Sequence, residues 1–143
     1  MSLGYNEIQQ AISAQIELLS GFKQAPTLPA YFGRLQNTLA HKGFVVGLPN
    51  SQQIPERQRR SVGTYLQTSI EVKFAFRLRP TDAYPLDYNN ALLTERLVCN
   101  QVLESYQAIK AGIQIRFENA NRAATESNEY MIHVLNFIIL HTI

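Results

Sequence analysis

Residues 64–79 constrain the fold most, because apolar and polar side chains alternate along this whole segment until Pro80. Successive side chains of a strand point to opposite faces of a sheet, so the alternation predicts one long, half-buried β-strand. Its even positions form the expected buried face: Leu66, Thr68, Ile70, Val72, Phe74, Phe76 and Leu78. Its odd positions carry charges of both signs, on Glu71, Lys73, Arg77 and Arg79. The strand therefore predicts a sheet with one covered face and one polar face.

Two other segments show the three- and four-residue apolar spacing of amphipathic helices. In residues 5–23 the apolar stripe follows Asn6, the expected N-cap, and consists of Ile8, Ile12, Ile16 and Leu19. The second predicted helix covers residues 86–109, with Asp82 or Asp87 as the cap. Its expected buried stripe is Leu92, Cys99, Val102, Leu103, Tyr106 and Ile109.

Shorter strand patterns surround these elements. Residues 43–48 and 113–117 predict short strands, while residues 31–39 fit either a short helix or an irregular strand. The segment 130–143 has β-branched and aromatic residues at both parities, which is typical of a strand covered on both faces or facing another subunit. The order of elements predicts an α+β fold, a mostly antiparallel sheet with the N-terminal helix and the long helix packed on one face.

Two polar stretches, residues 49–63 and 118–128, predict mobile loops. The first contains Arg57, Arg59 and Arg60, which could grip an acidic protein surface or a phosphate backbone, or simply be solvated. The second contains Arg122. A protein partner is favoured over nucleic acid, because Tyr65 is the only aromatic residue near the first cluster and the net charge is only +2.

Size and composition predict a single domain over residues 1–143. The chain is 45% hydrophobic and 17% charged, which fits a globular protein with a somewhat low share of charged residues. The opening residues lack the basic start and apolar run of a signal peptide, and the apolar run 137–140 is far too short to cross a membrane. We therefore expect a soluble, intracellular protein without disulfides, because Cys99 is the only cysteine.

The sequence contains no motif that indicates catalysis. It lacks a GxSxG elbow, a phosphate-binding Gly-rich loop and a pair of carboxylates that could be nominated for acid–base work. His133 and His141 share strand parity but would lie roughly 26 Å apart, too far to share a metal ion. The three histidines are interpreted as polar positions on partly solvated segments, and Cys99 as a small buried apolar residue. We expect no enzyme activity, cofactor, metal or small-molecule substrate.

The pattern resembles the tail terminator proteins of long-tailed bacteriophages and prophages. The segments that carry the likeness are YNEIQQAISAQIELL (5–19), YLQTSIEVKFAFRLRP (65–80), LDYNNALLTERLVCNQVLESY (86–106), IQIRF (113–117) and EYMIHVLNFIIL (129–140). The dipeptide Arg79-Pro80 strengthens the likeness, because it ends a predicted strand just before an acid-capped helix. The likeness rests on the order and pattern of elements, so no residue role is carried over, and residues 30–48 fit it least.

The resemblance implies a structural virion assembly protein that forms a hexameric ring, caps the tail tube and presents the head-attachment surface. Its partners would then be copies of itself, the tail-tube protein and the head–tail connector, in the bacterial cytoplasm during assembly and later in the virion tail. Candidate partner-binding residues are Arg57, Arg59, Arg60, Glu71, Lys73, Arg77, Arg79 and Arg122. The alternatives are a head-completion, neck or tail-tube protein, and a nucleic-acid-binding module that uses the basic cluster 57–60.

Overall fold

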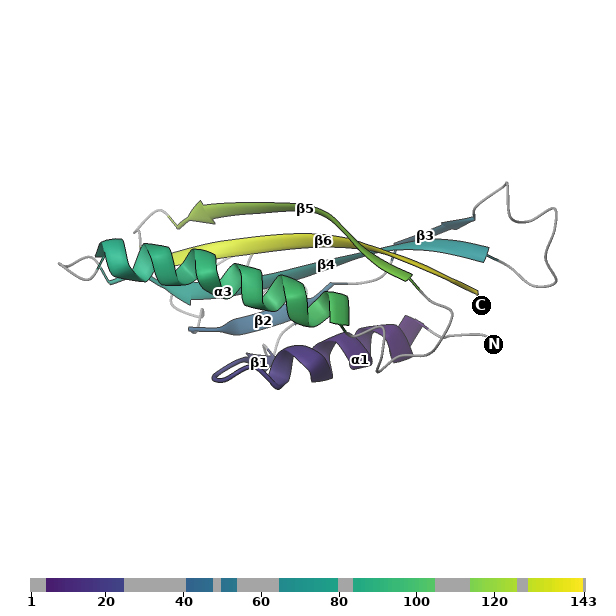
Figure 1. The fold of residues 1–143 in the computed structure, drawn as a ribbon, viewed down its shortest axis with the longest axis horizontal. Helices are drawn as coiled ribbons and strands as arrows, with labels where there is room; N and C mark the ends of the chain where they lie inside the picture. Colours follow the sequence, from purple (N-terminus) through teal and green to yellow (C-terminus); the bar gives the residue numbers. More distant parts are fainter. Residues whose placement is uncertain are drawn as a thin grey trace.

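The computed structural model describes residues 5–24, 41–47, 50–53, 65–79, 84–104, 114–125 and 129–142. Within these ranges the chain has an α+β fold, as the sequence predicts (Figure 1). The elements in chain order are α1 (Tyr5–Glu17), β1 (Lys23–Gln24), β2 (Gly43–Val46), β3 (Asn50–Gln53), β4 (Tyr65–Arg77), α3 (Tyr84–Glu104), β5 (Gln114–Ala124) and β6 (Tyr130–Thr142).

The strands form one sheet in the order β1-β2-β4-β6-β5, and β3 also pairs with β4. All of these pairs are antiparallel except β1 with β2. The predicted long strand is confirmed as β4, which pairs with β6 from Tyr65 opposite Thr142 to Arg77 opposite Tyr130. The predicted strand at 43–48 is confirmed in type as β2, which ends at Val46.

Both helices pack on the same face of the sheet and form one core with it (Figure 1). The even side chains of β4 from Ile70 to Phe76 all belong to this buried cluster, as does Leu78 just after the strand. From α1 it receives Ile8, Ile12 and Ile16, all fully buried, which are three of the four positions that the sequence predicts. Burying such a side chain is worth about 1.5–3 kcal/mol, so this cluster is the main source of stability among the described residues.

The turn after α1 directs Phe22 into the core. Gly21 adopts a left-handed conformation with φ of 83°, which glycine accepts readily because it has no Cβ. Phe22 then packs edge-on to Phe74, with ring centroids 5.5 Å apart, and contacts Phe44 at 6.3 Å. The predicted helix over 5–23 is therefore confirmed in type but ends at Glu17, and Asn6 lies inside it instead of capping it.

Helix α3 begins two residues earlier than predicted, with Pro85 in its first turn, where a missing backbone N–H costs nothing. Its buried apolar stripe is Ala91, Val98 and Val102, and Leu92, Cys99 and Leu103 lie only partly buried beside it. Val102 is thus confirmed as a buried position, whereas the predicted residues Leu92, Cys99 and Leu103 lie about one residue around the helix from the buried side. Tyr106 and Ile109 lie outside the described residues.

Both predicted mobile loops are wrong over part of their length. Residues 50–53 form β3, whose polar side chains include Ser51, hydrogen-bonded to Thr68 across the ladder at 2.6 Å between hydroxyl oxygens. Residues 118–124 belong to β5, which continues well past Phe117. A β-bulge between Phe117 and Asn119 shifts the register there, so the strand keeps pairing with β6. These polar segments form strands because their backbones hydrogen-bond to a neighbouring strand, not because their side chains are buried.

Candidate interaction surface

The face of the sheet opposite α1 and α3, called the open face below, has an apolar row between two polar rows. Residues paired in an antiparallel ladder share a face, so the register places each side chain. The apolar row comes from β6 and consists of Ile132, Val134, Asn136 and Ile138. On one side lie Ser69, Glu71, Lys73 and Ala75 of β4. On the other side lie Arg116, Asn119, Asn121 and Ala123 of β5.

The apolar row is half-buried by its neighbours, whereas the β5 row is exposed. Asn136 interrupts the aliphatic residues and donates a hydrogen bond from Nδ2 to Oδ1 of Asn119 at 2.8 Å. Glu71 and Lys73 form an exposed ion pair at 3.3 Å, and such pairs contribute at most about 1 kcal/mol to stability. The centre of the open face therefore offers aliphatic surface with a polar rim.

The candidate partner-binding residues do not form one site. Glu71, Lys73 and Arg77 lie on the odd, open-face side of β4. Arg79 instead binds Asp87 in the first turn of α3, and Arg122 binds Glu95 on the helix side of the sheet. Arg57, Arg59 and Arg60 lie outside the described residues, between the paired strands β3 and β4.

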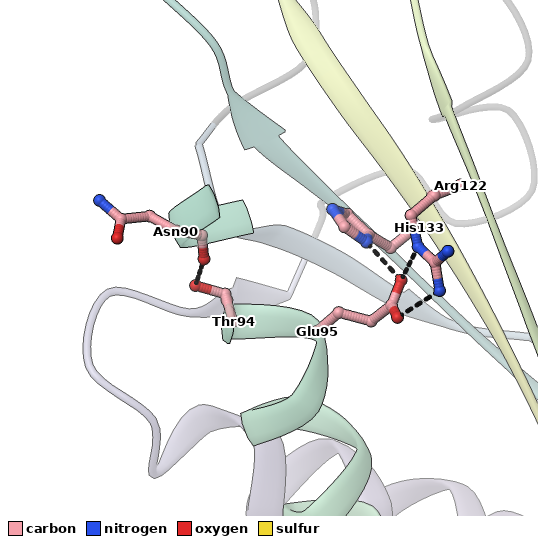
Figure 2. Close-up of polar contacts among 5 residues, drawn as sticks. All are labelled: Asn90, Thr94, Glu95, Arg122 and His133. Atoms are coloured by element: carbon pink, nitrogen blue, oxygen red, sulfur yellow. Dashed lines mark hydrogen bonds and ion pairs between the residues drawn. The ribbon is translucent and has the colours of Figure 1, made fainter. Parts of the chain in front are cut away.

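Glu95 of α3 joins His133 of β6 to Arg122 of β5 (Figure 2). Its Oε1 lies 2.7 Å from Nδ1 of His133 and accepts a hydrogen bond from Nε of Arg122 at 2.8 Å. Its Oε2 accepts another from Nη2 of Arg122 at 2.6 Å. An ionised carboxylate only accepts, so Nδ1 of His133 carries the proton. The cluster ties the middle of α3 to two strands.

The environment sets the charge states of this cluster. Burial lowers the pKa of His133, and the neighbouring Glu95 only partly opposes this effect. Burial would raise the pKa of Glu95, but the hydrogen bonds from Arg122 and His133 outweigh it, and the pKa lies below its ordinary value. Glu95 is thus ionised and His133 neutral near pH 7. The Nε2 of His133 is buried and accepts no hydrogen bond from any described residue.

His133 corrects the interpretation of the histidines as partly solvated positions, because its side chain is 0% exposed. Its ring stacks on Phe74 with centroids 4.4 Å apart, which closes it off from any substrate. The pair of Glu95 and His133 therefore has the polar contacts of an acid–base dyad but no access for chemistry. The parity of His133, shared with Met131 and Leu135, is the sequence signal that could have placed it in the core.

A second polar cluster lies where β4 ends and α3 begins. Asp87 accepts hydrogen bonds from Arg79 through the backbone N and Nε, both at 2.9 Å to Oδ2, and through Nη2 at 2.8 Å to Oδ1. These bonds lower the pKa of Asp87 to about 2. Asp87 therefore anchors the β4–α3 junction from inside the first turn of α3, so the sequence prediction that it caps the helix is wrong, and the alternative cap Asp82 lies outside the described residues.

The outer surface of α3 is unusually apolar. Leu86, Leu93 and Leu97 are 59%, 52% and 56% exposed, and their spacing places them on one stripe of the helix. Exposed leucines in a row differ from the scattered apolar residues of an ordinary surface. The described residues thus present two apolar surfaces on opposite sides of the molecule, the open face and this stripe.

No protein-family model matches the chain, and no curated protein matches its sequence. Neither α1 nor α3 is long and apolar enough to span a membrane. Among the residues with described positions, no three His, Cys, Asp or Glu side chains gather closely enough to hold a metal ion.

Proposed function

We propose that the protein is a structural assembly protein of a phage or prophage tail, a tail terminator whose copies form a ring that caps the tail tube and receives the head. The observation that carries this proposal is the open face, where aliphatic side chains of β6 lie between the polar rows of β4 and β5. A central apolar area with a polar rim is the usual anatomy of a surface that binds another protein.

The order of elements also supports the proposal. Helix α1, the long strand β4, helix α3 and the closing pair β5–β6 follow one another as in the family that the sequence resembles. The ring would use a repeated contact between identical subunits, so each copy must offer two complementary surfaces. The open face and the leucine stripe of α3 are candidates for the two surfaces, because both are apolar and they lie on different sides of the subunit.

The proposal is tested by measuring the mass of the full-length chain at micromolar concentration, with negative-stain imaging of its outline. The variant Val134→Glu places a charge in the middle of the open face, next to Lys73, which faces it across the ladder. Its matched control, Gln10→Glu, adds the same charge at an exposed position of α1, away from both candidate surfaces. We expect a closed ring for the native chain and the control, and at least tenfold weaker association for Val134→Glu at unchanged thermal stability.

Each alternative predicts a different result. Stacking of the native chain into open tubes would reject the terminator in favour of a tail-tube subunit. A monomer that also leaves the ends of tail tubes from its own phage uncapped would reject the ring altogether. Binding of DNA that weakens steeply with salt would instead support the nucleic-acid-binding module.

A further inference from the structure

Besides these surfaces, the structure contains a cationic pocket of about 290 Å³ at the end of β4. The described residues that line it are His41, Phe76, Arg77, Arg79 and Asp87. They come from three places in the chain: the residues before β2, the end of β4 and the first turn of α3. The volume lies just below the usual range for ligand pockets, about 300–1,000 Å³, and suits a single small chemical group.

The hydrogen-bond donors of the pocket are only partly used. The described residues include no partner for the guanidinium of Arg77, although its backbone N–H donates to Nδ1 of His41 at 3.0 Å. Arg79 gives Nε and one N–H of Nη2 to Asp87, which leaves Nη1 available. Because Nδ1 of His41 is an acceptor, the proton of the neutral ring is on Nε2. Three side chains thus have donors to offer to an acceptor in the pocket.

The charge of the pocket favours a singly charged anion. Arg77 and Arg79 contribute two positive charges, and Asp87 contributes one negative charge because its pKa is about 2. His41 is neutral, since burial and the adjacent Lys42 and Arg77 lower its pKa, with Asp87 opposing them weakly. The described lining residues therefore carry a net charge of +1. A single carboxylate neutralises this charge, whereas a phosphate dianion would leave the occupied pocket with a net charge of −1.

Two rings supply apolar contact beside these donors. The ring of His41 lies edge-on to Phe76 with centroids 4.6 Å apart, which fixes both rings at the pocket wall. The methylene groups of an acidic side chain could pack against such rings while its carboxylate reaches the guanidinium groups. Forked hydrogen bonds from arginine to a carboxylate are among the strongest polar contacts in proteins.

From these observations we propose that the pocket binds one carboxylate group of a partner polypeptide, an aspartate or glutamate side chain, with Arg77 as its main anchor. This inference does not depend on ring formation, because the pocket belongs to a single chain. The described residues contain no partner for the side chain of Arg77, and the bound carboxylate would be that partner.

The test follows the side-chain N–H signals of Arg77 and Arg79 by NMR while N-acetylglutamate N-methylamide is added to the full chain. Saturable shifts are expected at millimolar concentrations, together with no response to the glutamine analogue. Arg77→Gln should weaken binding at least tenfold. Arg96→Gln, which removes the same charge from an exposed position of α3, should leave it unchanged. Thermal melts of both variants check that the fold is retained.

Further probes separate the possible sources of the anion. Acetate should bind several-fold more weakly than the glutamate derivative, because it lacks the methylene groups that contact the rings. Equal binding of acetate would overturn the assignment to a polypeptide side chain. Tighter binding of inorganic phosphate at pH 7.5 would overturn the choice of a carboxylate. Equal affinity of Arg77→Gln and Arg96→Gln for the glutamate derivative would show that Arg77 does not bind the carboxylate. The absence of any NMR shift in the native chain would show that the pocket binds no carboxylate.

Discussion

Replacement of Glu95 by glutamine should lower the free energy of unfolding by about 2–3 kcal/mol. Three hydrogen bonds end on this carboxylate, at 2.6, 2.7 and 2.8 Å. A hydrogen bond to a charged group is worth about 1.5–3 kcal/mol, but bonds that share one acceptor group do not add. The amide keeps the shape of the side chain and can still accept from one neighbour. Arg122 is 40% exposed, so water replaces part of what it loses.

Chemical denaturation followed by circular dichroism measures this loss, and the midpoint of thermal unfolding should fall by roughly 5–10 °C. The matched control is Glu71→Gln, which breaks the exposed pair with Lys73 and should cost less than about 1 kcal/mol. The two substitutions are chemically identical and differ only in burial and partners. Equal costs for Glu95→Gln and Glu71→Gln would refute the argument that the buried cluster holds α3 to β5 and β6.

Two further predictions follow from charge and backbone geometry. His41 and His133 have pKa values below the ordinary 6.5, so below about pH 6.5 the unfolded chain binds more protons than the native one. The free energy of unfolding should therefore decrease as the pH falls from about 7 to about 5. His133→Gln should make this decrease smaller in denaturant titrations at several pH values. An unchanged pH dependence in this variant would contradict the role of His133. Gly21→Ala should cost about 1 kcal/mol in the same assay, because φ is 83° there, and a neutral substitution would show that the turn relaxes.

Hydrophobic periodicity was sufficient to predict the elements that build the core. The alternation of β4 and the spacing of Ile8, Ile12 and Ile16 depend on burial against one sheet face, which a single sequence records directly. The strand β3 and the second half of β5 were missed because nothing in their polar side chains records a strand. Their backbones pair with β4 and β6, and that information lies in the partner strands.

For the polar clusters too, local periodicity predicts the face on which a residue lies but not the residue that it contacts. Arg122 was a candidate for binding a partner, yet it is paired with Glu95, a residue from a segment far away in the sequence. Periodicity could have placed His133 on the buried side of β6, but not opposite Glu95, because the position of α3 along the sheet depends on tertiary packing. Likewise, the pocket at Arg77 requires His41, β4 and α3 to meet, which no local pattern indicates.

The position of β6 in the sheet has a consequence for how the chain acquires its structure. Among the described elements β6 is the last to leave the ribosome, yet it lies between β4 and β5. Until it emerges, β4 has no neighbour on that side, and β5 has no partner at all among the described strands. Pairing between segments so distant in the chain is slow, and waiting strands are prone to aggregate. We therefore expect the sheet to close only after synthesis of β6, so that nascent chains halted before Tyr130 would need a chaperone to stay soluble.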